Sequence, residues 1–276
     1  MVIFKLMKNS ASLTVEPIGF VHCTKQLKFE APHQPDSGSG ETNTIVLLPG
    51  KQFEIALEDL AGFDRIWLVW WFDKNKTWRP RAMPPRGPAK RRGVFATRSP
   101  HRPNPIGLTC VPLISVDGLT LTVGALDLMD GTPILDIKPY LSTVDAFPES
   151  SLGWVGEVEE LIAKSPRFEI QISPLAAQQL EWLRVNWNIE FAETAFAKLA
   201  IDPMPHRTRR ILRIEDRYRI ACGPWRMYYR VVSQTVVIEE IQKGYSDESL
   251  VLPGHEKIID REAQIEFAKT NFSGTV

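Results

Sequence analysis

The chain has few cysteines, no long apolar run and no excess of charge of either sign. Its 276 residues include three cysteines, widely separated and without a Cys-x-x-Cys pair, so neither a disulfide framework nor a structural zinc site is expected. No run approaches the roughly 20 apolar residues of a membrane-spanning helix, and the N-terminus lacks the apolar core of a targeting signal. With 33 basic and 33 acidic residues, the formal net charge is zero. These absences favour a cytoplasmic protein in a reducing compartment.

Several common site signatures are also missing. No Gly-x-Gly-x-x-Gly follows a strand to open a helix, and there is no P-loop, His-Glu-x-x-His or Gly-x-Ser-x-Gly. The five histidines show no metal-ligand spacing, so no metal is expected. The sequence therefore argues against a Rossmann nucleotide site, a zinc protease and an α/β hydrolase.

Short strands separated by turn residues dominate residues 15–147. Residues 53–60 form the one candidate helix there, and Asp117-Gly118 predicts a hairpin turn. Segments rich in β-branched and aromatic residues predict strands at 45–48, 65–72, 93–97, 108–116 and 119–126. The pattern predicts a mainly β protein whose first domain, residues 12–150, is a β-barrel of mixed strands.

Helical patterns begin beyond residue 150. Ser173-Pro174 is a helix start, with serine as N-cap and proline in the first turn. The pattern predicts helices at 176–185 and 189–200, strands at 217–222, 225–232 and 235–241, and a tail helix at 260–269. We therefore expect a small α+β domain over 155–245, a boundary near 148–157 and a C-terminal extension over 246–276.

The most informative stretch is residues 93–109, Gly-Val-Phe-Ala-Thr-Arg-Ser-Pro-His-Arg-Pro-Asn-Pro-Ile-Gly-Leu-Thr. Three prolines within eight residues fix φ and disfavour helix at the preceding positions, so the loop is stiff and holds Arg98 and Arg102 on a frame. Because loops often carry function, we interpret it as a contact for an anion or nucleotide. The alternative is a stiff connector between two strands.

The same loop ends a window without acidic residues, from Asp73 to Asp117. A block of one sign attracts phosphate, and the aromatic residues Trp78 and Phe95 lie among the charges. The window holds Lys74, Lys76, Arg79, Arg81, Arg86, Lys90, Arg91, Arg92, Arg98 and Arg102. The alternative is a solvated basic face compensated by acids elsewhere. A second basic edge, 207–213, carries the same pair of interpretations.

Three aspartates follow in a second cluster, residues 124–140. Asp127 alternates with Leu126 and Leu128, so its carboxylate points to the opposite face and could hold a ribose hydroxyl or a cation. Asp130-Gly131 is also ordinary turn chemistry, and Asp136 could equally cap or pair with a basic residue.

Residues 93–109, Pro84 to Arg86 and Asp127 to Tyr140 together resemble the TsaA-like family, whose characterised members are the TrmO tRNA methyltransferases. Supporting matches are Pro17-Ile18-Gly19, Pro32-His33-Gln34-Pro35 and Gly62-Phe63-Asp64-Arg65-Ile66-Trp67-Leu68. The resemblance covers residues 16–147, and more weakly Asp202-Pro203-x-Pro205 and the strands after it. It implies a β-barrel enzyme that uses S-adenosylmethionine, with a small C-terminal domain, acting as a homodimer. The implied reaction is N6-methylation of threonylcarbamoyl-adenosine beside the anticodon of tRNA.

The resemblance also implies positions for the site residues. The implied donor contacts are Pro32, His33, Gln34, Asp73, Lys74, Arg98, Leu108, Gly124, Ala125, Leu126 and Asp127. The implied contacts to the tRNA anticodon loop are Arg86, Arg91, Arg92, Arg102, Arg207 and Arg209. The chain departs from the family pattern in two places: the family usually has arginine where His33 stands, and His-x where Asp73-Lys74 stand.

Methyl transfer from a sulfonium is an in-line displacement, so positioning should supply most of the catalysis. The acceptor nitrogen of a carbamoylated adenine is a poor nucleophile, so a group should accept its proton. The sequence identifies no base; Arg98, Asp127 and Asp136 are the catalytic candidates. Two other functions stay open: a non-catalytic RNA-binding or regulatory barrel, and an S-adenosylmethionine enzyme acting on a small molecule.

The aromatic segment Trp67, Trp70, Trp71 and Phe72 bears on assembly. It supplies more aromatic surface than one face of a strand can bury, which favours a homodimer. The alternative is that both faces of this strand are covered within one chain.

Overall fold

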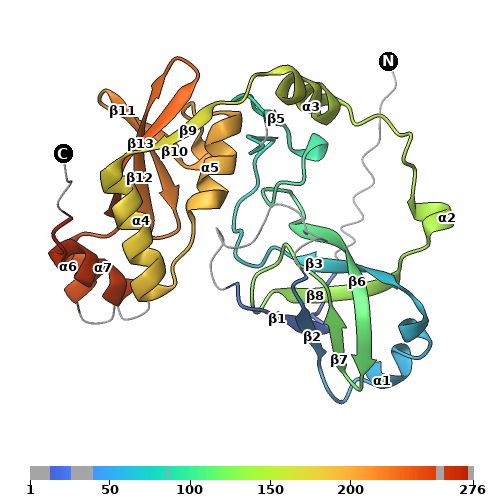
Figure 1. Ribbon diagram of the computed structural model, residues 1–276. Helices are drawn as coiled ribbons and strands as arrows, with labels where there is room; N and C mark the ends of the chain where they lie inside the picture. Colours follow the sequence, from blue (N-terminus) through green and yellow to red (C-terminus); the bar gives the residue numbers. More distant parts are fainter. Residues whose placement is uncertain (1–12, 26–39, 86, 253–257, 273–276) are drawn as a thin grey trace. The chain divides into compact units, whose positions relative to one another are not determined.

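The computed structural model describes residues 13–25, 40–85, 87–252 and 258–272 (Figure 1). The chain divides into two compact units. One comprises residues 1–80 and 94–148 and is called the barrel unit here; the other comprises residues 81–93 and 149–276 and is called the α+β unit. The basic window of the sequence is therefore shared between them, since residues 81–93 belong to the α+β unit.

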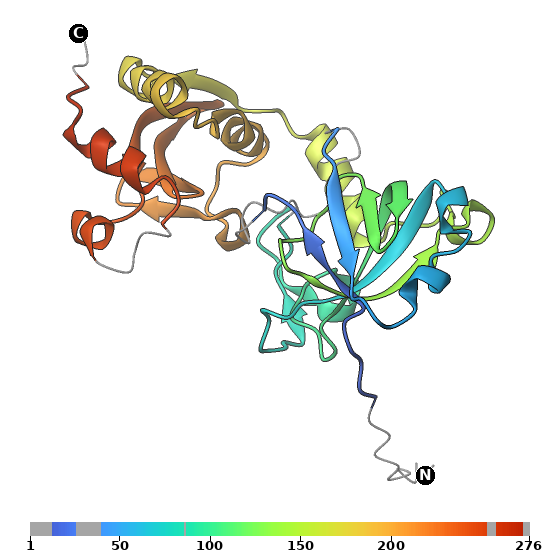
Figure 2. The same ribbon diagram turned by 90° about the horizontal axis from the view of Figure 1, so that it is seen from below.

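Six strands of the barrel unit close into a barrel in the order β1-β2-β7-β6-β3-β8 (Figures 1 and 2). The strands are β1 (Gly19–His22), β2 (Asn43–Leu47), β3 (Arg65–Trp71), β6 (Ile106–Asp117), β7 (Thr120–Val123) and β8 (Pro133–Pro139). Each of these pairings is antiparallel, which corrects the expectation of mixed strands. Antiparallel neighbours can be joined by a tight turn, as β6 and β7 are at residues 118 and 119, whereas parallel ones need a long crossover. The predicted barrel is confirmed.

Alternating side chains fill the interior of the barrel, as in small closed barrels generally. Ile66 and Leu68 of β3 are fully buried, and Val111 of β6 and Leu121 of β7 meet them in one apolar cluster. The β6–β7 hairpin turns at Gly118, whose φ of +55° suits glycine, as the Asp-Gly sequence predicts. The predicted helix at 53–60 is reduced to two short turns, α1 (Phe53–Ala56) and η1 (Leu60–Gly62), and α2 (Ser142–Asp145) follows the barrel.

The prediction of a strand at 93–97 is wrong. The segment contains the end of β5 (Arg92–Gly93), which pairs with β4 (Arg81–Ala82), and then one 3-10 turn, η2 (Val94–Ala96). The hydroxyl of Thr97 donates to the carbonyl of Val94 at 2.8 Å, and the guanidinium of Arg102 donates to both the Val94 and the Thr97 carbonyls. Side chains of the loop thus bind carbonyls that strand pairing would use, which favours a turn.

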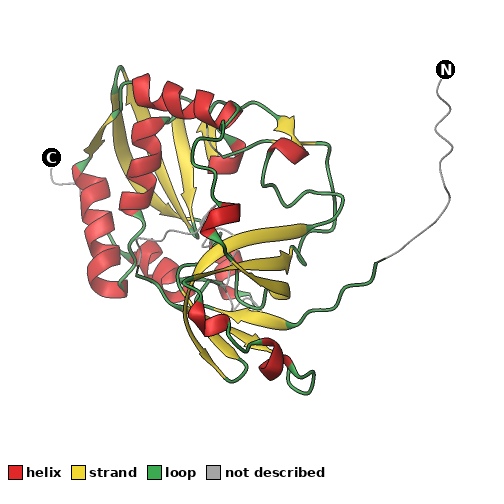
Figure 3. Ribbon diagram, turned by 90° about the vertical axis from the view of Figure 1, so that its right-hand side faces the viewer, coloured by secondary structure: helices red, strands yellow, loops and turns green. Residues whose placement is uncertain are grey.

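The α+β unit is built on a five-stranded sheet in the order β10-β11-β12-β13-β9, with β9 parallel to β13. The strands are β9 (Glu169–Ile172), β10 (Ile211–Ile214), β11 (Arg217–Cys222), β12 (Trp225–Val232) and β13 (Thr235–Lys243). The helices are α3 (Trp154–Lys164), α4 (Pro174–Trp187), α5 (Ala192–Ile201), η3 (Arg207–Arg209), α6 (Asp247–Val251) and α7 (Arg261–Lys269). Figure 3 shows helices lying against the sheet. Leu183, Leu199 and Phe267, from α4, α5 and α7, share one core cluster with Trp225 and Ile238 of the strands, so the helices cover one face.

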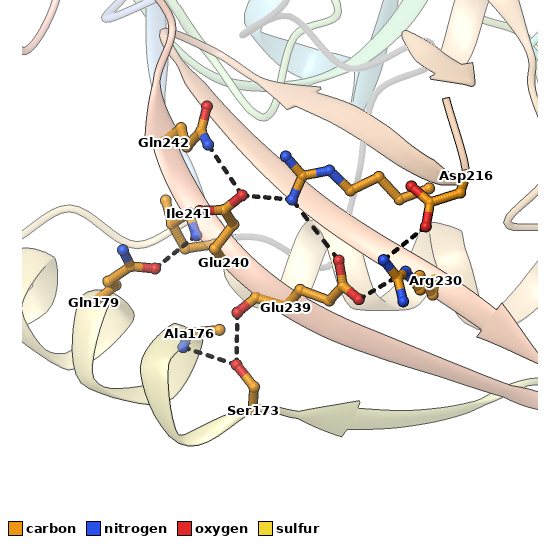
Figure 4. Close-up of polar contacts among 10 residues, drawn as sticks. Ser173, Ala176, Gln179, Asp216, Arg230, Glu239, Glu240, Ile241 and Gln242 are labelled. Carbon is orange, nitrogen blue, oxygen red and sulfur yellow. Dashed lines mark hydrogen bonds and ion pairs between the residues drawn. The ribbon is translucent and has the colours of Figure 1, made fainter. Parts of the chain in front are cut away.

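Polar contacts that begin at the N-cap of helix α4 fix this helix to strand β13 (Figure 4). The hydroxyl of Ser173 accepts a hydrogen bond from the Ala176 amide at 3.0 Å, which is the predicted N-cap, and donates to the Glu239 carbonyl at 2.6 Å. One turn later the buried side chain of Gln179 accepts from the Ile241 amide at 2.7 Å. The predicted helices and the three predicted strands of this unit are confirmed, whereas α3, β9 and β10 were not predicted.

Candidate functional site

A cavity of about 910 Å³ lies in the barrel unit, a size typical of small-molecule sites. The end of β3, the proline-rich loop, the start of β6 and the segment after β7 form its wall. Its lining includes aromatic, apolar, polar and charged side chains. Among the lining residues are Trp67, Trp70, Trp71, Phe72, Asp73, Lys74, Thr97, Arg98, Arg102, Ile106, Leu108, Thr109, Ala125, Asp127, Leu128 and Met129.

A chain of hydrogen bonds leads from a buried tryptophan to a carboxylate in this cavity. The indole N–H of Trp70 donates to the hydroxyl of Thr109 at 3.1 Å, and that hydroxyl donates to Oδ1 of Asp127 at 2.9 Å. Trp70 and Thr109 are buried, so both donors are shielded from water. The chain fixes the direction of the Asp127 carboxylate, because each donor has one partner.

The indole of Trp70 has its place only because its neighbour on β6 is glycine. Gly107 lies opposite Trp70 in the strand register, and a Cβ on Gly107 would come within 2.2 Å of the indole ring. On its other side the indole packs against Phe72 with ring centroids 4.1 Å apart. A side chain at position 107 would therefore displace the ring that starts the hydrogen-bond chain.

Burial raises the pKa of the Asp127 carboxyl above its ordinary value. The hydrogen bond from Thr109 lowers this pKa in part, as do the positive charges of Arg98 and Lys25. Desolvation is the largest of these effects, so the carboxylate is a stronger base than one in water. A raised pKa in a cavity, oriented by a hydrogen bond, is typical of a functional carboxylate.

The two arginines of the stiff loop differ in what they contact. Arg102 donates to the carbonyls of Val94 and Thr97 at 3.2 and 2.7 Å and lies 5.7 Å from the centre of the Phe95 ring. Arg98 is exposed and lines the cavity, and within the described part of the chain no hydrogen bond or ion pair holds its guanidinium. Arg102 therefore holds the loop, and Arg98 is available to a ligand.

The structure brings together about half of the donor contacts that the resemblance implies. Asp73, Lys74, Arg98, Leu108, Ala125 and Asp127 all line the cavity. Gly124 and Leu126 do not: the carbonyl of Gly124 accepts from Asn43 at 3.1 Å, and Leu126 is fully buried in the barrel core. Strand β7 ends at Val123, so the strand predicted at 119–126 is three residues too long at its end. Pro32, His33 and Gln34 lie outside the described residues.

Asp136, the second aspartate among the catalytic candidates, is not one of the residues that line the cavity. Asp136 belongs to β8, where its carboxylate pairs with Lys138 at 2.8 Å and accepts from the backbone amide of Ile137. Its charge is thus partnered, as one of the two sequence interpretations proposed. Of the three catalytic candidates, Arg98 and Asp127 share the cavity.

The arginines expected to contact tRNA fall in different surroundings. In the α+β unit, Arg91 and Arg207 are exposed, Arg92 lies 5.0 Å from the centre of the Trp154 ring, and Arg209 pairs with Asp202 at 2.6 Å. In the barrel unit Arg102 holds the loop, as described above. Arg86 lies outside the described residues. Contact of these side chains with tRNA remains a prediction.

Sequence reasoning missed the two polar residues that orient Asp127. Thr109 is a buried polar residue between Leu108 and Cys110, and Trp70 was noted only as aromatic bulk. The signal for Trp70 is the long-range pairing with Gly107, which becomes visible only once the register of β3 and β6 is known. No local pattern contains it.

Membrane spans and metal sites are both missing from the described ranges. There, no helix is long and apolar enough to cross a membrane, and no group of three or more histidine, cysteine, aspartate or glutamate side chains is placed to hold a metal ion.

Comparison with known proteins agrees with this geometry. Residues 20–146, which include all the cavity residues, match the model of the tRNA-methyltransferase O N-terminal domain. A protein of Pseudomonas aeruginosa, named as a candidate S-adenosylmethionine-dependent methyltransferase, RcsF, is 35% identical over 195 residues, 70% of this chain and 82% of the relative. The chain belongs to the tRNA-methyltransferase O family.

Two further relatives are similar to part of this chain. The Escherichia coli tRNA (adenine(37)-N6)-methyltransferase is 40% identical over 154 residues, 52% of this chain and 64% of that protein. A protein of Archaeoglobus fulgidus, named as a candidate S-adenosyl-L-methionine-binding protein, is 39% identical over 166 residues, 58% of this chain and 44% of that protein. The chain thus spans less than two thirds of the length of these two relatives.

The α+β unit has a separate similarity. Residues 170–247, from β9 to β13 with the start of α6, match the model of the ParE toxin of the type II toxin-antitoxin system parDE.

Proposed function

We propose that this chain is an S-adenosylmethionine-dependent methyltransferase that methylates the N6 atom of an adenosine in tRNA. The observation that carries the proposal is the carboxylate of Asp127, oriented by Thr109 and sharing with Arg98 a cavity of a chain that belongs to the tRNA-methyltransferase O family. The names of the relatives in Escherichia coli and Pseudomonas aeruginosa support the donor and the tRNA substrate. More finely, we propose that the substrate is threonylcarbamoyl-adenosine next to the anticodon.

The residues of the cavity fit the methyl donor. S-adenosylmethionine supplies a methyl group on a positively charged sulfur, and it also carries a carboxylate and an aromatic base. The aromatic rings of Trp70, Trp71 and Phe72 and the carboxylate of Asp127 offer a cation a favourable surface. The guanidinium of Arg98 offers the carboxylate a charge-assisted hydrogen bond.

Asp127 is the residue best placed to accept a proton from the acceptor nitrogen. The Thr109 hydroxyl donates to Oδ1 of Asp127, and the residue lines the cavity. The raised pKa brings the carboxylate closer to the basicity that proton acceptance requires. Binding of donor and acceptor in one cavity would lower the entropic part of the barrier to methyl transfer.

The exposed aromatic residues of the barrel unit suit a single-stranded RNA loop. Trp78 is 54% and Phe95 76% exposed, both within the basic window. Unpaired bases of an anticodon loop can stack on such rings while phosphates meet arginines. This surface supports the tRNA loop as the partner.

A homodimer is part of the proposal. Of the four aromatic residues in the sequence argument for a dimer, three have partners within the chain. Trp70 is buried and packs on Phe72, and Trp67 donates to Asp145 at 3.0 Å. Trp71 remains 42% exposed, directly opposite Ile106 in the register, which is 46% exposed. We expect a second copy to cover this apolar surface. Light scattering that finds a monomer with full donor affinity would remove this part of the proposal.

The test is methylation of tRNA in vitro followed by mass analysis of its nucleosides. We expect a methyl group on N6 of an adenosine, and transfer only to tRNA that carries the threonylcarbamoyl group. Transfer to unmodified tRNA would leave the tRNA methyltransferase assignment standing and reject the finer substrate. A calorimetric titration that shows no binding of S-adenosylmethionine would instead favour a non-catalytic RNA-binding barrel.

A further inference from the structure

The face of the α+β sheet opposite its core carries a series of arginines. Ile220 of β11 and Met227 of β12 point into the core beneath the helices. Because side chains alternate along a strand, Arg219 and Arg226 project from the other face. Arg219 is the third residue of β11, and Arg226 is the second residue of β12.

Arg219 and Arg226 come together on this face through the register of the strands, and Arg210 lies close enough for its charge to act on Arg226. The Ala221 amide donates to the Arg210 carbonyl at 3.1 Å, and Ala221 pairs with Arg226 on the next strand. Arg219 lies two residues before Ala221 on the same face, diagonal to Arg226. Diagonal positions on a sheet face are within reach of long side chains.

The guanidinium of Arg226 is held in place without being neutralised. It donates to the carbonyls of Gly223, Trp225 and Gly244 at 3.1, 2.8 and 3.4 Å, and carbonyls carry no net charge. Gly244 makes room for it, since a Cβ there would lie 2.7 Å from the guanidinium carbon. The backbone therefore fixes the position of a full positive charge.

The arginines around Arg226 disfavour its charged form. Burial lowers the pKa of Arg226, and the positive charges of Arg210 and Arg219 lower it further. Arg219 adds an unsatisfied group, because its Nε is buried and has no hydrogen-bond partner within the described part of the chain. Holding like charges close together costs electrostatic free energy in the folded chain. An anionic ligand bound between them would offset this cost.

The other half of the same face shows the contrasting arrangement (Figure 4). Arg217 pairs with Glu240 at 2.5 Å, and Arg230 pairs with Asp216 at 2.7 Å and with Glu239 at 3.0 Å. There each arginine has an acidic partner. Among the described residues, the face is thus divided into a half whose arginines pair with acids and a half in which Arg219 and Arg226 do not.

We propose that Arg219 and Arg226, with Arg210 beside them, bind the phosphate backbone of tRNA. Guanidinium groups match phosphate oxygens in geometry, and neighbouring arginines spread across a sheet suit an extended polyanion better than a single ion. The choice of tRNA rests on the proposed function. This contact is distinct from the one expected at Arg207 and Arg209, of which Arg209 already pairs with Asp202.

The test measures binding of the full-length chain to tRNA over a series of salt concentrations. Each lost phosphate contact should reduce the slope of log affinity against log salt by about one. We therefore expect a slope lower by about one for Arg219→Gln and by about two for Arg219→Gln with Arg226→Gln. The conservative variant Arg219→Lys keeps the positive charge, so it should keep most of the slope.

Arg230→Gln is the matched control, because it removes one positive charge from the same face at a position already paired with acids. Its slope should equal that of the unmodified chain. Arg226→Gln removes three hydrogen bonds to carbonyls and can disturb the fold. The decisive variant is therefore Arg219→Gln, provided that its melting curve is normal. An unchanged slope for folded Arg219→Gln, or an equal loss for Arg230→Gln, overturns the proposal.

Two further measurements separate this proposal from the proposed function. In methylation assays Arg219→Gln should raise the KM for tRNA and leave kcat unchanged. A chain that binds tRNA through these arginines but transfers no methyl group rejects the proposed function alone. Titration with inorganic phosphate distinguishes the ligand: tight phosphate binding that depends on Arg219, with a tRNA slope that does not, overturns the assignment to RNA.

Discussion

The cavity of the barrel unit and the arginine face of the α+β unit differ in the sign and in the arrangement of their charged side chains. In the cavity the carboxylate of Asp127 is half-buried and oriented by a chain of two hydrogen bonds. On the sheet face, Arg219 and Arg226 lie as neighbours of the same sign, one of them fixed by backbone carbonyls. A carboxylate with one fixed direction suits chemistry at one atom. Several like charges on a surface suit a ligand with repeated charges of the other sign.

The largest expected effect separates chemistry from binding. Asp127→Asn keeps the shape of the side chain and can still accept the hydrogen bond from Thr109, but it cannot accept a proton. We expect kcat to fall by about 10² to 10⁴, the usual worth of a positioned acid or base, with tRNA affinity unchanged. Arg219→Gln should do the reverse. If Asp127→Asn retains its turnover, Asp127 is not the base.

The two arginines of the proline-rich loop should also differ in effect, one changing turnover and the other changing stability. Arg98→Ala removes a guanidinium that lines the cavity and, among the described residues, holds nothing else, so we expect methylation to fall by on the order of 10² to 10³ with normal stability. Arg102→Ala leaves the carbonyls of Val94 and Thr97 without this donor and should lower the free energy of unfolding by about 1 kcal/mol. Thermal melting and turnover of both variants check this. Equal losses of turnover without any change in melting would remove the distinction.

A third change tests the support of the cavity. Gly107→Ala places a Cβ where the Trp70 ring lies, so the ring must move. We expect a loss of about 1–3 kcal/mol in unfolding free energy, typical of overpacking, and weaker donor binding. The control is Gly62→Ala, since a Cβ at Gly62 meets no neighbouring atom among the described residues. Denaturant unfolding of the two variants should differ by most of that amount.

The smallest expected effect is a pH dependence of stability. The folded pKa of Asp127 is raised above its ordinary value of 3.8, so the folded state binds the proton more tightly and stability falls as pH rises between the two. Asp127→Asn has no carboxyl to titrate, so it does not lose stability in this way as pH rises. It should therefore unfold at higher denaturant than the unmodified chain near neutral pH, with the difference vanishing below pH 3.8. Arg219→Gln should show no such dependence, because arginine stays charged over this range. A difference that stays constant with pH would mean that burial does not shift this carboxyl.

Local sequence determined much of the fold. The alternation of Ile66, Leu68 and Trp70 fixed which face of β3 is buried, Ser173-Pro174 fixed the start of α4, and Gly118 fixed a turn. The stiffness of the loop around Arg98 also follows from its prolines. Each of these depends on residues within a few positions of one another.

Only the tertiary structure decided which of the sequence's candidates act together. Asp127 and Thr109 are 18 residues apart and meet across the β6–β7 pair, whose register brings them together, while Asp136, equally good by local pattern, pairs with Lys138. The grouping of Arg219 with Arg226 on the α+β sheet depends in the same way on the pairing of β11 with β12. The physical reason is that strand register is a long-range property: it sets which side chains share a face, and charge and burial at a site are sums over that shared face.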